Sequence, residues 1–186
     1  MSGKFRRQLA YYVEYHRDPY NCAMHVFGII FLFLAAVLPL SLWLVTAFGV
    51  QANAGAIAVI PVLIYWLLLD PLLGLAIVGA AVLLLVIAAA IASYVSVAAV
   101  WIISAVLIGI GVASQIVGHQ VFERRQPALR DNPTHLLMGP MFVMAKLFIA
   151  LGFRHDLAVV IQQGSQTAHG ASLYQHERQG DVQRHP

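Results

Sequence analysis

The sequence between Val26 and Val117 contains a single charged residue, Asp70. Runs of about 20 apolar residues can cross the hydrocarbon core of a bilayer as helices, because a helix hydrogen-bonds its own backbone polar groups. Only 10% of the chain is charged, whereas a soluble domain carries roughly 25% charged residues. The sequence therefore predicts an all-α integral membrane protein embedded in a lipid bilayer.

Four apolar segments are the candidates for membrane crossings. They cover residues 26–47, 54–69, 72–92 and 97–117. The second is somewhat short for a full crossing, and Asp70-Pro71 separates it from the third. If residues 54–92 instead formed one kinked helix, three crossings would remain. Pro39 is expected to kink the first crossing, and residues 48–53 are expected to form a short turn.

The number of crossings decides whether the two polar flanks of the membrane domain lie on the same side. An even number brings them together, whereas an odd number would separate them by about 30 Å. Both flanks are basic, and neither loop expected on the opposite side contains Lys or Arg. The basic residues are Lys4, Arg6, Arg7, Arg17, Arg124, Arg125 and Arg130. The positive-inside rule then favours four crossings in a bacterial inner membrane, with both termini in the cytoplasm.

The first 25 residues are polar and predict an amphipathic helix that breaks at Asp18-Pro19. Asp18 suits the N-cap of a new helix, and Pro19 suits its first position. The break matters because His16 and His25 would point to opposite sides of an unbroken helix, whereas a corner lets them converge. Since this region lacks the apolar core of a signal peptide, the first crossing is expected to direct insertion.

The apolar stretch over residues 134–153 is expected to be an interfacial or re-entrant helix. Gly139-Pro140 splits it, Lys146 lies inside it, and the part after the proline is too short to cross a bilayer. We expect it to cover the polar site at this end of the protein from the cytoplasmic side. Residues 1–154 are therefore predicted to form one membrane domain, and residues 155–186 a polar, flexible tail.

Histidines lie in both polar flanks and predict a metal site. His119 and Glu123 are four residues apart, so they share one face of a helix. Imidazole nitrogens bind iron, zinc, copper and nickel, and a hydrogen bond to the second ring nitrogen usually orients them. Four crossings bring His16, His25 and His119 to one interface as candidate ligands. His135 is a fourth candidate. Further ligands or orienting groups are expected among Asn21, Asp70, Glu123 and Asp131.

Each of these residues also has a simpler interpretation. A histidine at a helix end is often a satisfied core or interfacial residue. Arg124-Arg125 can anchor lipid headgroups, Glu123 can pair with an arginine, and Asp70 can cap a helix. The tyrosines near the N-terminus are most simply an interfacial aromatic belt, made of Tyr11, Tyr12, Tyr15 and Tyr20. No function is expected for the tail histidines His155, His169, His176 and His185.

Two motif blocks carry a resemblance to a known family. The first block reads His16-x-Asp18-Pro19-x-Asn21-x3-His25-x2-Gly28. The second block reads Gln115-x2-Gly118-His119-x3-Glu123-x3-Pro127-Ala128-Leu129-x-Asp131-Asn132, followed by Gly139-Pro140-Met141-Phe142. With the apolar spans between them, these blocks resemble the small membrane family that includes the fungal 2-hydroxy fatty acid dioxygenase of phytosphingosine breakdown.

The resemblance implies a multi-spanning, Fe(II)-dependent enzyme that uses O₂ to convert a 2-hydroxy fatty acid into the acid one carbon shorter. It implies His16, His25 and His119 as iron ligands, with His135 as a further candidate. Asn21, Glu123 and Arg124 are then expected to act in catalysis. A 2-hydroxy acid can chelate one metal through its carboxylate and hydroxyl, and Arg17 or Arg124 could neutralise the carboxylate. A helical bundle in lipid also offers an apolar slot for the acyl chain.

Three other functions fit the sequence. A bis-histidine haem electron carrier would bind its haem non-covalently, because no C-x-x-C-H motif is present. A zinc hydrolase acting on lipids would use the same ligands. A transporter or structural membrane protein would need no metal, although no inverted repeat is evident. The basic residues form no stripe with interleaved aromatic residues, so nucleic-acid binding is not expected, and the pattern does not specify an oligomeric state.

Overall fold

The computed structural model describes residues 2–47, 49–123 and 135–162. Its elements, in chain order, are α1 (Gly3–Val13), α2 (Pro19–Leu40), β1 (Leu44–Ala47), β2 (Val50–Asn53), α3 (Ala54–Leu69), α4 (Pro71–Tyr94), α5 (Val97–Val117), the π-helix η1 (Gly118–Glu123) and α6 (His135–Ala150). A short helical segment, His155–Gln162, follows α6. The predicted helical membrane fold is confirmed, with one small antiparallel hairpin, β1–β2, added at its edge.

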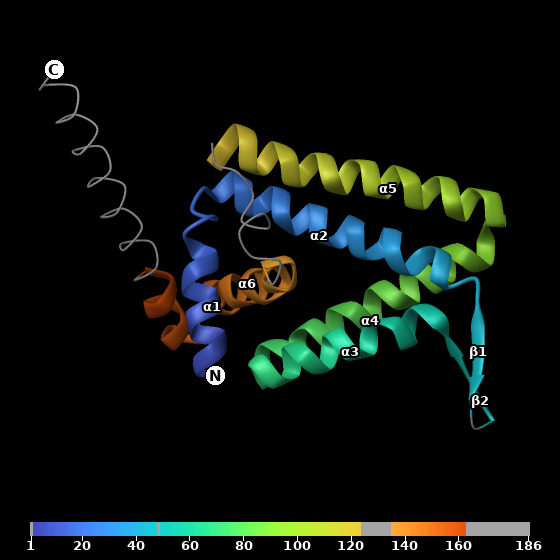
Figure 1. Ribbon diagram of the computed structural model, residues 1–186, viewed down its shortest axis with the longest axis horizontal. Helices are drawn as coiled ribbons and strands as arrows, with labels where there is room; N and C mark the ends of the chain where they lie inside the picture. The colour runs from blue at the N-terminus through green and yellow to red at the C-terminus, as the bar shows by residue number, and fades with distance from the viewer. Residues whose placement is uncertain (1, 48, 124–134, 163–186) are drawn as a thin grey trace, which may run out of the picture.

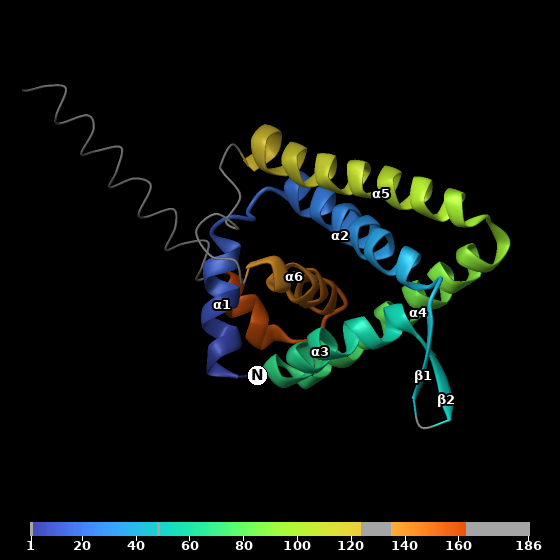
Figure 2. The same cartoon turned by 45° about the vertical axis from the view of Figure 1, so that its right-hand side comes forward.

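Two pairs of helices form the arms of a wedge. In both views α2 lies along α5 and α3 lies along α4 (Figure 1 and Figure 2). The arms meet near the hairpin, where Val37 of α2 packs in one core with Ala88 of α4 and Val100 of α5. α1 and α6 fill the open end of the wedge. A second core lies there, drawn from α1, α3, α4, α6 and the segment His155–Gln162.

The chain passes along the wedge four times. α2 runs toward the hairpin, α3 returns, α4 runs out again and α5 returns (Figure 1). Pro19–Leu40, Pro71–Tyr94 and the continuous helix Val97–Glu123 are long and apolar enough to cross a membrane. The 16 residues of α3 give an axial length of about 24 Å, short of the ~30 Å hydrocarbon core. Leu136–Ala150 and His155–Gln162, bent by 117°, add a fourth candidate if they form one span.

Polar side chains cap the helices at both predicted breaks. Asp18 Oδ1 accepts hydrogen bonds from two backbone N–H groups at the start of α2, and Pro19 takes the first helical position. At the second break the backbone of Asp70 is extended, and its side chain accepts from the N–H of Leu73 in α4. α3 and α4 are therefore two helices, which excludes the alternative of one kinked helix.

The predicted end of the first crossing is wrong. The helix ends at Leu40 instead of residue 47, and the β-hairpin follows. Pro39 lies in the last turn of α2, so its missing N–H removes one terminal bond and produces no kink inside a longer helix. The β-branched residues Val45 and Thr46 favour an extended chain. Gly49 supplies the positive φ of 77° that the turn between the strands requires.

Pro140 does not split the C-terminal helix as predicted. α6 is continuous from His135 to Ala150, with Pro140 inside it. Packing on both sides of the proline offsets the lost backbone hydrogen bond. Trp66 Nε1 donates to the carbonyl oxygen of Leu137 at 2.7 Å, and Met141 is fully buried.

The segment after α6 was predicted to belong to a polar tail. His155–Gln162 is helical, and its Leu157 and Val160 are buried in the core at the open end of the wedge. The apolar residues at 157, 160 and 161 have the spacing of one helix face, which explains why this segment packs. The rest of the predicted tail, residues 163–186, lies outside the described residues.

Glycines allow α2 to approach α5 and η1 closely. A Cβ at Gly111 would lie 2.7 Å from Cγ of Leu32, and a Cβ at Gly118 would lie 2.5 Å from Oδ1 of Asn21. Small residues let helix backbones pack tightly in a bilayer, where lipid is as apolar as the side chains it would replace. The approach at Gly118 brings the next residue, His119, against α2.

Candidate metal centre

Three histidines that are far apart in the sequence converge at the open end of the wedge. His16 lies in the corner between α1 and α2, His25 lies in the second turn of α2, and His119 lies in η1. Their exposed fractions are 3%, 5% and 4%. One ring nitrogen of each lies within 4.8 Å of the other two. The structure thus brings together the three histidines that the sequence singled out, because the number of helical passes is even.

Backbone carbonyls fix the protonation of two of the three rings. His16 Nδ1 donates to the carbonyl oxygen of Tyr12, and His25 Nδ1 donates to that of Asn21, both at 3.0 Å. Because a carbonyl only accepts, each Nδ1 carries the proton of the neutral ring and each Nε2 carries a lone pair. These two Nε2 atoms face each other at 3.1 Å. Two lone pairs at that distance repel unless a proton or a metal cation lies between them.

The third imidazole contains an unsatisfied nitrogen. His119 Nδ1 is buried and has no hydrogen-bond partner in the described part of the chain. A buried polar atom without a partner costs about 1–3 kcal/mol, so a ligand at this nitrogen would stabilise the fold. His119 lies in a π-helix, a wider turn that occurs frequently at functional sites.

The spacing of the Nε2 atoms of His16 and His25 fits two ligands of one metal ion. Two ligands at right angles, each about 2.1 Å from a metal, lie about 3 Å apart, close to the 3.1 Å between the Nε2 atoms of His16 and His25. Imidazoles oriented by carbonyl groups suit a divalent transition metal. Two histidines on opposite faces of a haem keep their coordinating nitrogens about 4 Å apart with the macrocycle between them. The 3.1 Å between the Nε2 atoms of His16 and His25 is shorter, which favours direct ligation of one ion over a haem bound between these two rings.

Glu123 holds the N-terminal corner against η1. Its carboxylate accepts hydrogen bonds from the backbone N–H groups of Arg17, at 3.1 and 3.2 Å, and of Asp18, at 3.0 Å. The side-chain amide of Asn21 donates to the same carboxylate at 2.9 Å. Both carboxylate oxygens are therefore engaged, and Glu123 does not belong to the convergent group of ligand atoms found in the described residues. Glu123 and Asn21 thus tie the corner that carries His16 to η1, which carries His119.

The other predicted site residues fall in different places. Arg17 follows His16, and its Nε is buried without a hydrogen-bond partner among the residues described. His135 is the first residue of α6, but its side chain lies outside what the structure describes. Arg124 and Asp131 also lie outside the described residues.

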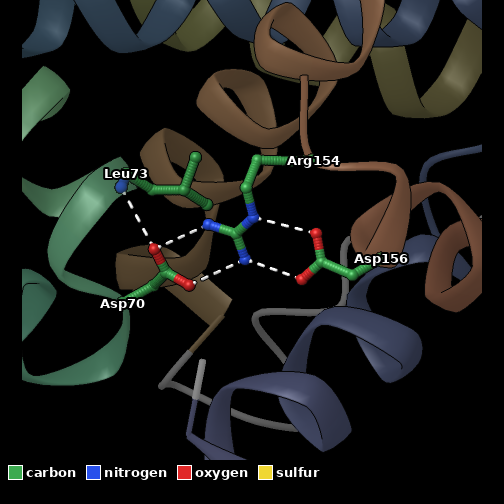
Figure 3. A network of polar contacts seen from close by, with 4 residues as sticks. All are labelled: Asp70, Leu73, Arg154 and Asp156. Atoms are coloured by element: carbon green, nitrogen blue, oxygen red, sulfur yellow. Dashed lines mark hydrogen bonds and ion pairs between the residues drawn. The ribbon is translucent and has the colours of Figure 1, made fainter. Parts of the chain in front are cut away.

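Asp70 has a structural role away from the histidine cluster. Arg154 donates to both of its carboxylate oxygens at 2.9 Å and also binds Asp156 (Figure 3). Burial acts to raise the pKa of the Asp70 carboxyl, but hydrogen bonds from Arg154 and from the N–H of Leu73 outweigh it and hold the pKa below its usual value. Asp70 is therefore not one of the clustered ligand groups found in the described residues, and its alternative role as a helix cap is confirmed.

Sequence reasoning missed Tyr12, which it assigned to an interfacial aromatic belt. Tyr12 is only 3% exposed, and its ring stacks on His16 with 3.9 Å between centroids and 4° between planes. Phe142 of α6 lies against both rings. Burial raises the pKa of the Tyr12 phenol, so the hydroxyl stays protonated at neutral pH. The four-residue spacing of Tyr12 and His16 was the available signal, since it places both on one helical face.

Lys146 also reaches the edge of the site. Its Nζ donates to Sγ of Cys22 at 3.1 Å and lies 4.9 Å from the ring centroid of Phe142. The Cys22 thiol in turn donates to the carbonyl oxygen of His16 at 3.6 Å. A polarisable sulfur and an aromatic face thus stabilise a half-buried ammonium within an apolar helix. No local pattern connects Lys146 with Cys22, which is 124 residues away.

Comparisons with known proteins point to one family. The family model described as 2-hydroxy-palmitic acid dioxygenase Mpo1-like matches residues 2–151. The chain is similar to the 2-hydroxy-palmitic acid dioxygenase MPO1 of Saccharomyces cerevisiae, with 32% identity over 160 residues that cover 84% of this chain and 87% of the yeast protein. No solved structure matches the chain. The matched region contains the three convergent histidines and Glu123.

Proposed function

The chain belongs to the Mpo1-like family of 2-hydroxy-palmitic acid dioxygenases, and we propose that it is an Fe(II)-dependent dioxygenase of lipid α-oxidation. Its substrates are a 2-hydroxy fatty acid and O₂, and its product is the fatty acid one carbon shorter. The observation that carries this proposal is the close approach of the Nε2 atoms of His16 and His25, 3.1 Å apart and buried beside His119. Imidazole suits iron, and reduction of O₂ favours a redox-active metal over zinc.

The reaction breaks the bond between the carboxyl carbon and the carbon that carries the hydroxyl. The carboxyl carbon leaves as CO₂, and the hydroxyl-bearing carbon becomes the new carboxyl group. These changes release four electrons, which reduce O₂ and yield one water, so no further reductant is needed. Bound Fe(II) would supply the site for O₂ and for the chelating hydroxyl and carboxylate groups of the substrate.

Residues of the chain hold the reacting groups in place. Glu123 and Asn21 fix the corner that carries His16, and their proposed role in the reaction is to position this ligand. We assign Arg17 the role of neutralising the substrate carboxylate, because its buried Nε has no hydrogen-bond partner within the described residues. Arg124 as a second carboxylate partner and His135 as a fourth ligand stay predictions.

We further propose that the site faces the cytoplasm of a bacterial inner membrane. The basic N-terminal helix α1 lies at the same end as the histidines, whereas residues 41–53 and 93–96 at the hairpin end contain no Lys or Arg. Alkaline phosphatase inserted at Gly49 should be active, and the same enzyme fused before Met1 should be inactive. The opposite pattern would place the site on the other side.

Product analysis tests the proposed reaction. Purified protein loaded with Fe(II) should convert 2-hydroxyhexadecanoate and O₂ into pentadecanoate and CO₂ in equal amounts, measured by mass spectrometry. Hexadecanoate, which lacks the hydroxyl, should remain unchanged. Iron-loaded protein that leaves the 2-hydroxy acid intact would contradict this substrate assignment. Equal turnover by zinc-loaded protein would contradict the assignment of iron.

A further inference from the structure

An apolar cavity of about 160 Å³ lies inside the wedge, between α2, α3, α4 and α6. Every residue that lines it is apolar, apart from the indole N–H of Trp66. That N–H donates to the carbonyl oxygen of Leu137, so it presents no free donor to the cavity. The same hydrogen bond ties α6 to α3 and fixes the cavity wall. The space is therefore suited to a hydrocarbon ligand.

The cavity begins next to the histidine cluster. Val26 lines it and directly follows His25, and Ile29 lines it one helical turn further along the same face. Gly139 of α6 lies where Ile29 meets Tyr12: a Cβ there would be 2.9 Å from Cδ1 of Ile29 and 3.4 Å from the Tyr12 hydroxyl. Since the Tyr12 ring stacks on His16, the cavity adjoins the candidate metal centre.

The helices give the cavity a direction. α2 and α4 both run away from the histidine end (Figure 1), so the lining residues Phe33 and Leu84 lie farthest from the histidines. Val26 and Phe33 are seven residues apart, which corresponds to about 10 Å along α2.

We propose that this cavity binds the hydrocarbon chain of the 2-hydroxy fatty acid, with the carboxyl end at the histidines and the chain directed toward Phe33 and Leu84. The identity of the ligand rests on the proposed function. The three histidines are each at most 5% exposed, which favours a ligand with a small head, such as a single carboxylate, over a bulky phospholipid headgroup. The hydrocarbon chain of the ligand would move from the apolar bilayer into an apolar cavity. The shape of the cavity must therefore select the ligand, because hydrophobicity alone does not.

Blocking and enlarging the cavity should change chain-length preference in opposite directions. Ala80→Phe would place a ring in the cavity, and we expect it to lower kcat/KM for 2-hydroxyhexadecanoate relative to 2-hydroxydecanoate by tenfold or more. Phe33→Ala should shift the preference toward longer chains. Ala89→Phe is the matched control, since Ala89 is an exposed residue of α4 that does not line the cavity. Equal chain-length profiles in all three variants and the wild type would overturn the proposal.

Photolabelling tests binding without turnover. A 2-hydroxyhexadecanoate probe with a diazirine near the middle of its chain is bound to the Fe(II)-loaded protein without O₂. We expect label on the peptides that contain Phe33 or Leu84, a loss of at least fivefold in Ala80→Phe, and no loss in Ala89→Phe. Label confined to other surfaces, or equal competition by phosphatidylcholine, would overturn the proposal. Labelling of the cavity by a protein with no turnover would refute the reaction and still support the binding site.

Discussion

The histidine cluster and the Asp70–Arg154–Asp156 network are both groups of polar side chains at helix ends, but they differ in how completely their buried members are hydrogen-bonded. In the network, each carboxylate oxygen of Asp70 accepts a hydrogen bond from Arg154, whose guanidinium lies between the carboxylates of Asp70 and Asp156 (Figure 3). In the cluster, the Nε2 atoms of His16 and His25 are 3.1 Å apart with no acceptor between them, and His119 Nδ1 has no partner in the described chain. A complete network stabilises a fold by itself, whereas an incomplete one needs a ligand.

The two regions also connect different parts of the protein. Arg154 joins the α3–α4 break to the segment after α6, so the network fixes the packing of the helices. The histidines come from the N-terminal corner, α2 and η1, and Glu123 keeps these three segments together. We therefore expect substitutions in the network to change stability, and substitutions in the cluster to change metal binding and activity.

The largest expected effect is the loss of activity in His25→Ala. Removing an orienting group costs about 10–100-fold in metal affinity or activity, so removing a ligand should cost more than about 100-fold. Turnover of 2-hydroxyhexadecanoate and helical content by circular dichroism are the measurements. His155→Ala is the matched control, because His155 is exposed and is not one of the three clustered histidines. Wild-type turnover in His25→Ala would end the ligand assignment.

Arg154→Met should have the largest effect on stability. It removes the positive charge and the two hydrogen bonds that Arg154 supplies to the Asp70 carboxylate, whose side chain is 2% exposed, and losing the charged partner of a buried pair costs about 3–5 kcal/mol. The free energy of unfolding in detergent is the measurement. Asp156→Asn should cost less than about 1 kcal/mol, because that carboxylate is 50% exposed. If both variants were equally stable, or if Arg154→Met selectively lost iron, the division between the two regions would be wrong.

Glu123→Ala should weaken metal binding by about 10–100-fold, because the corner that carries His16 loses its acceptor at η1. Glu123→Gln keeps one acceptor oxygen and should have a smaller effect. Titration of Fe(II) under anaerobic conditions measures both affinities. Unchanged affinity in Glu123→Ala would show that the corner holds its shape without this carboxylate.

The smallest expected effect is a pH dependence of stability that arises in the network. The pKa of Asp70 in the folded protein is below its usual value, so its stabilising contribution is present above the unfolded pKa of about 3.9 and is lost as the pH falls below it. The difference in unfolding free energy between the wild type and Asp70→Asn should therefore shrink on acidification below about pH 4. A difference that grows at low pH would contradict the assigned direction of the shift.

The sequence predicted features that depend on local chemistry. Asp18-Pro19 specifies a cap and a corner, and Asp70-Pro71 specifies a break. The even number of helical passes between His16 and His119 brings these two residues together. The sequence did not predict features that depend on distant contacts. Arg154 is 84 residues from Asp70, and neither position carries a pattern that identifies its partner.

Pro140 and η1 show the same limitation within single elements. A proline in a short apolar stretch predicts a break, but packing against Trp66 and the buried Met141 keeps α6 continuous. The π-helix has no sequence signature comparable to a cap, so the four-residue spacing of His119 and Glu123 indicated a shared face without the wider turn. The burial of Tyr12 depends on its contact with Phe142 of α6, which is far away in the sequence. The sequence alone therefore indicated an interfacial position for Tyr12.

The central claim is that His16, His25 and His119 together hold one iron ion. Elemental analysis of protein purified without air tests it most directly, with wild type and the His16→Ala/His25→Ala/His119→Ala variant prepared in parallel. We expect one iron per chain in the wild type and almost none in the triple variant, at equal helical content. Equal iron in both proteins, or stoichiometric zinc in place of iron in the wild type, would contradict the claim.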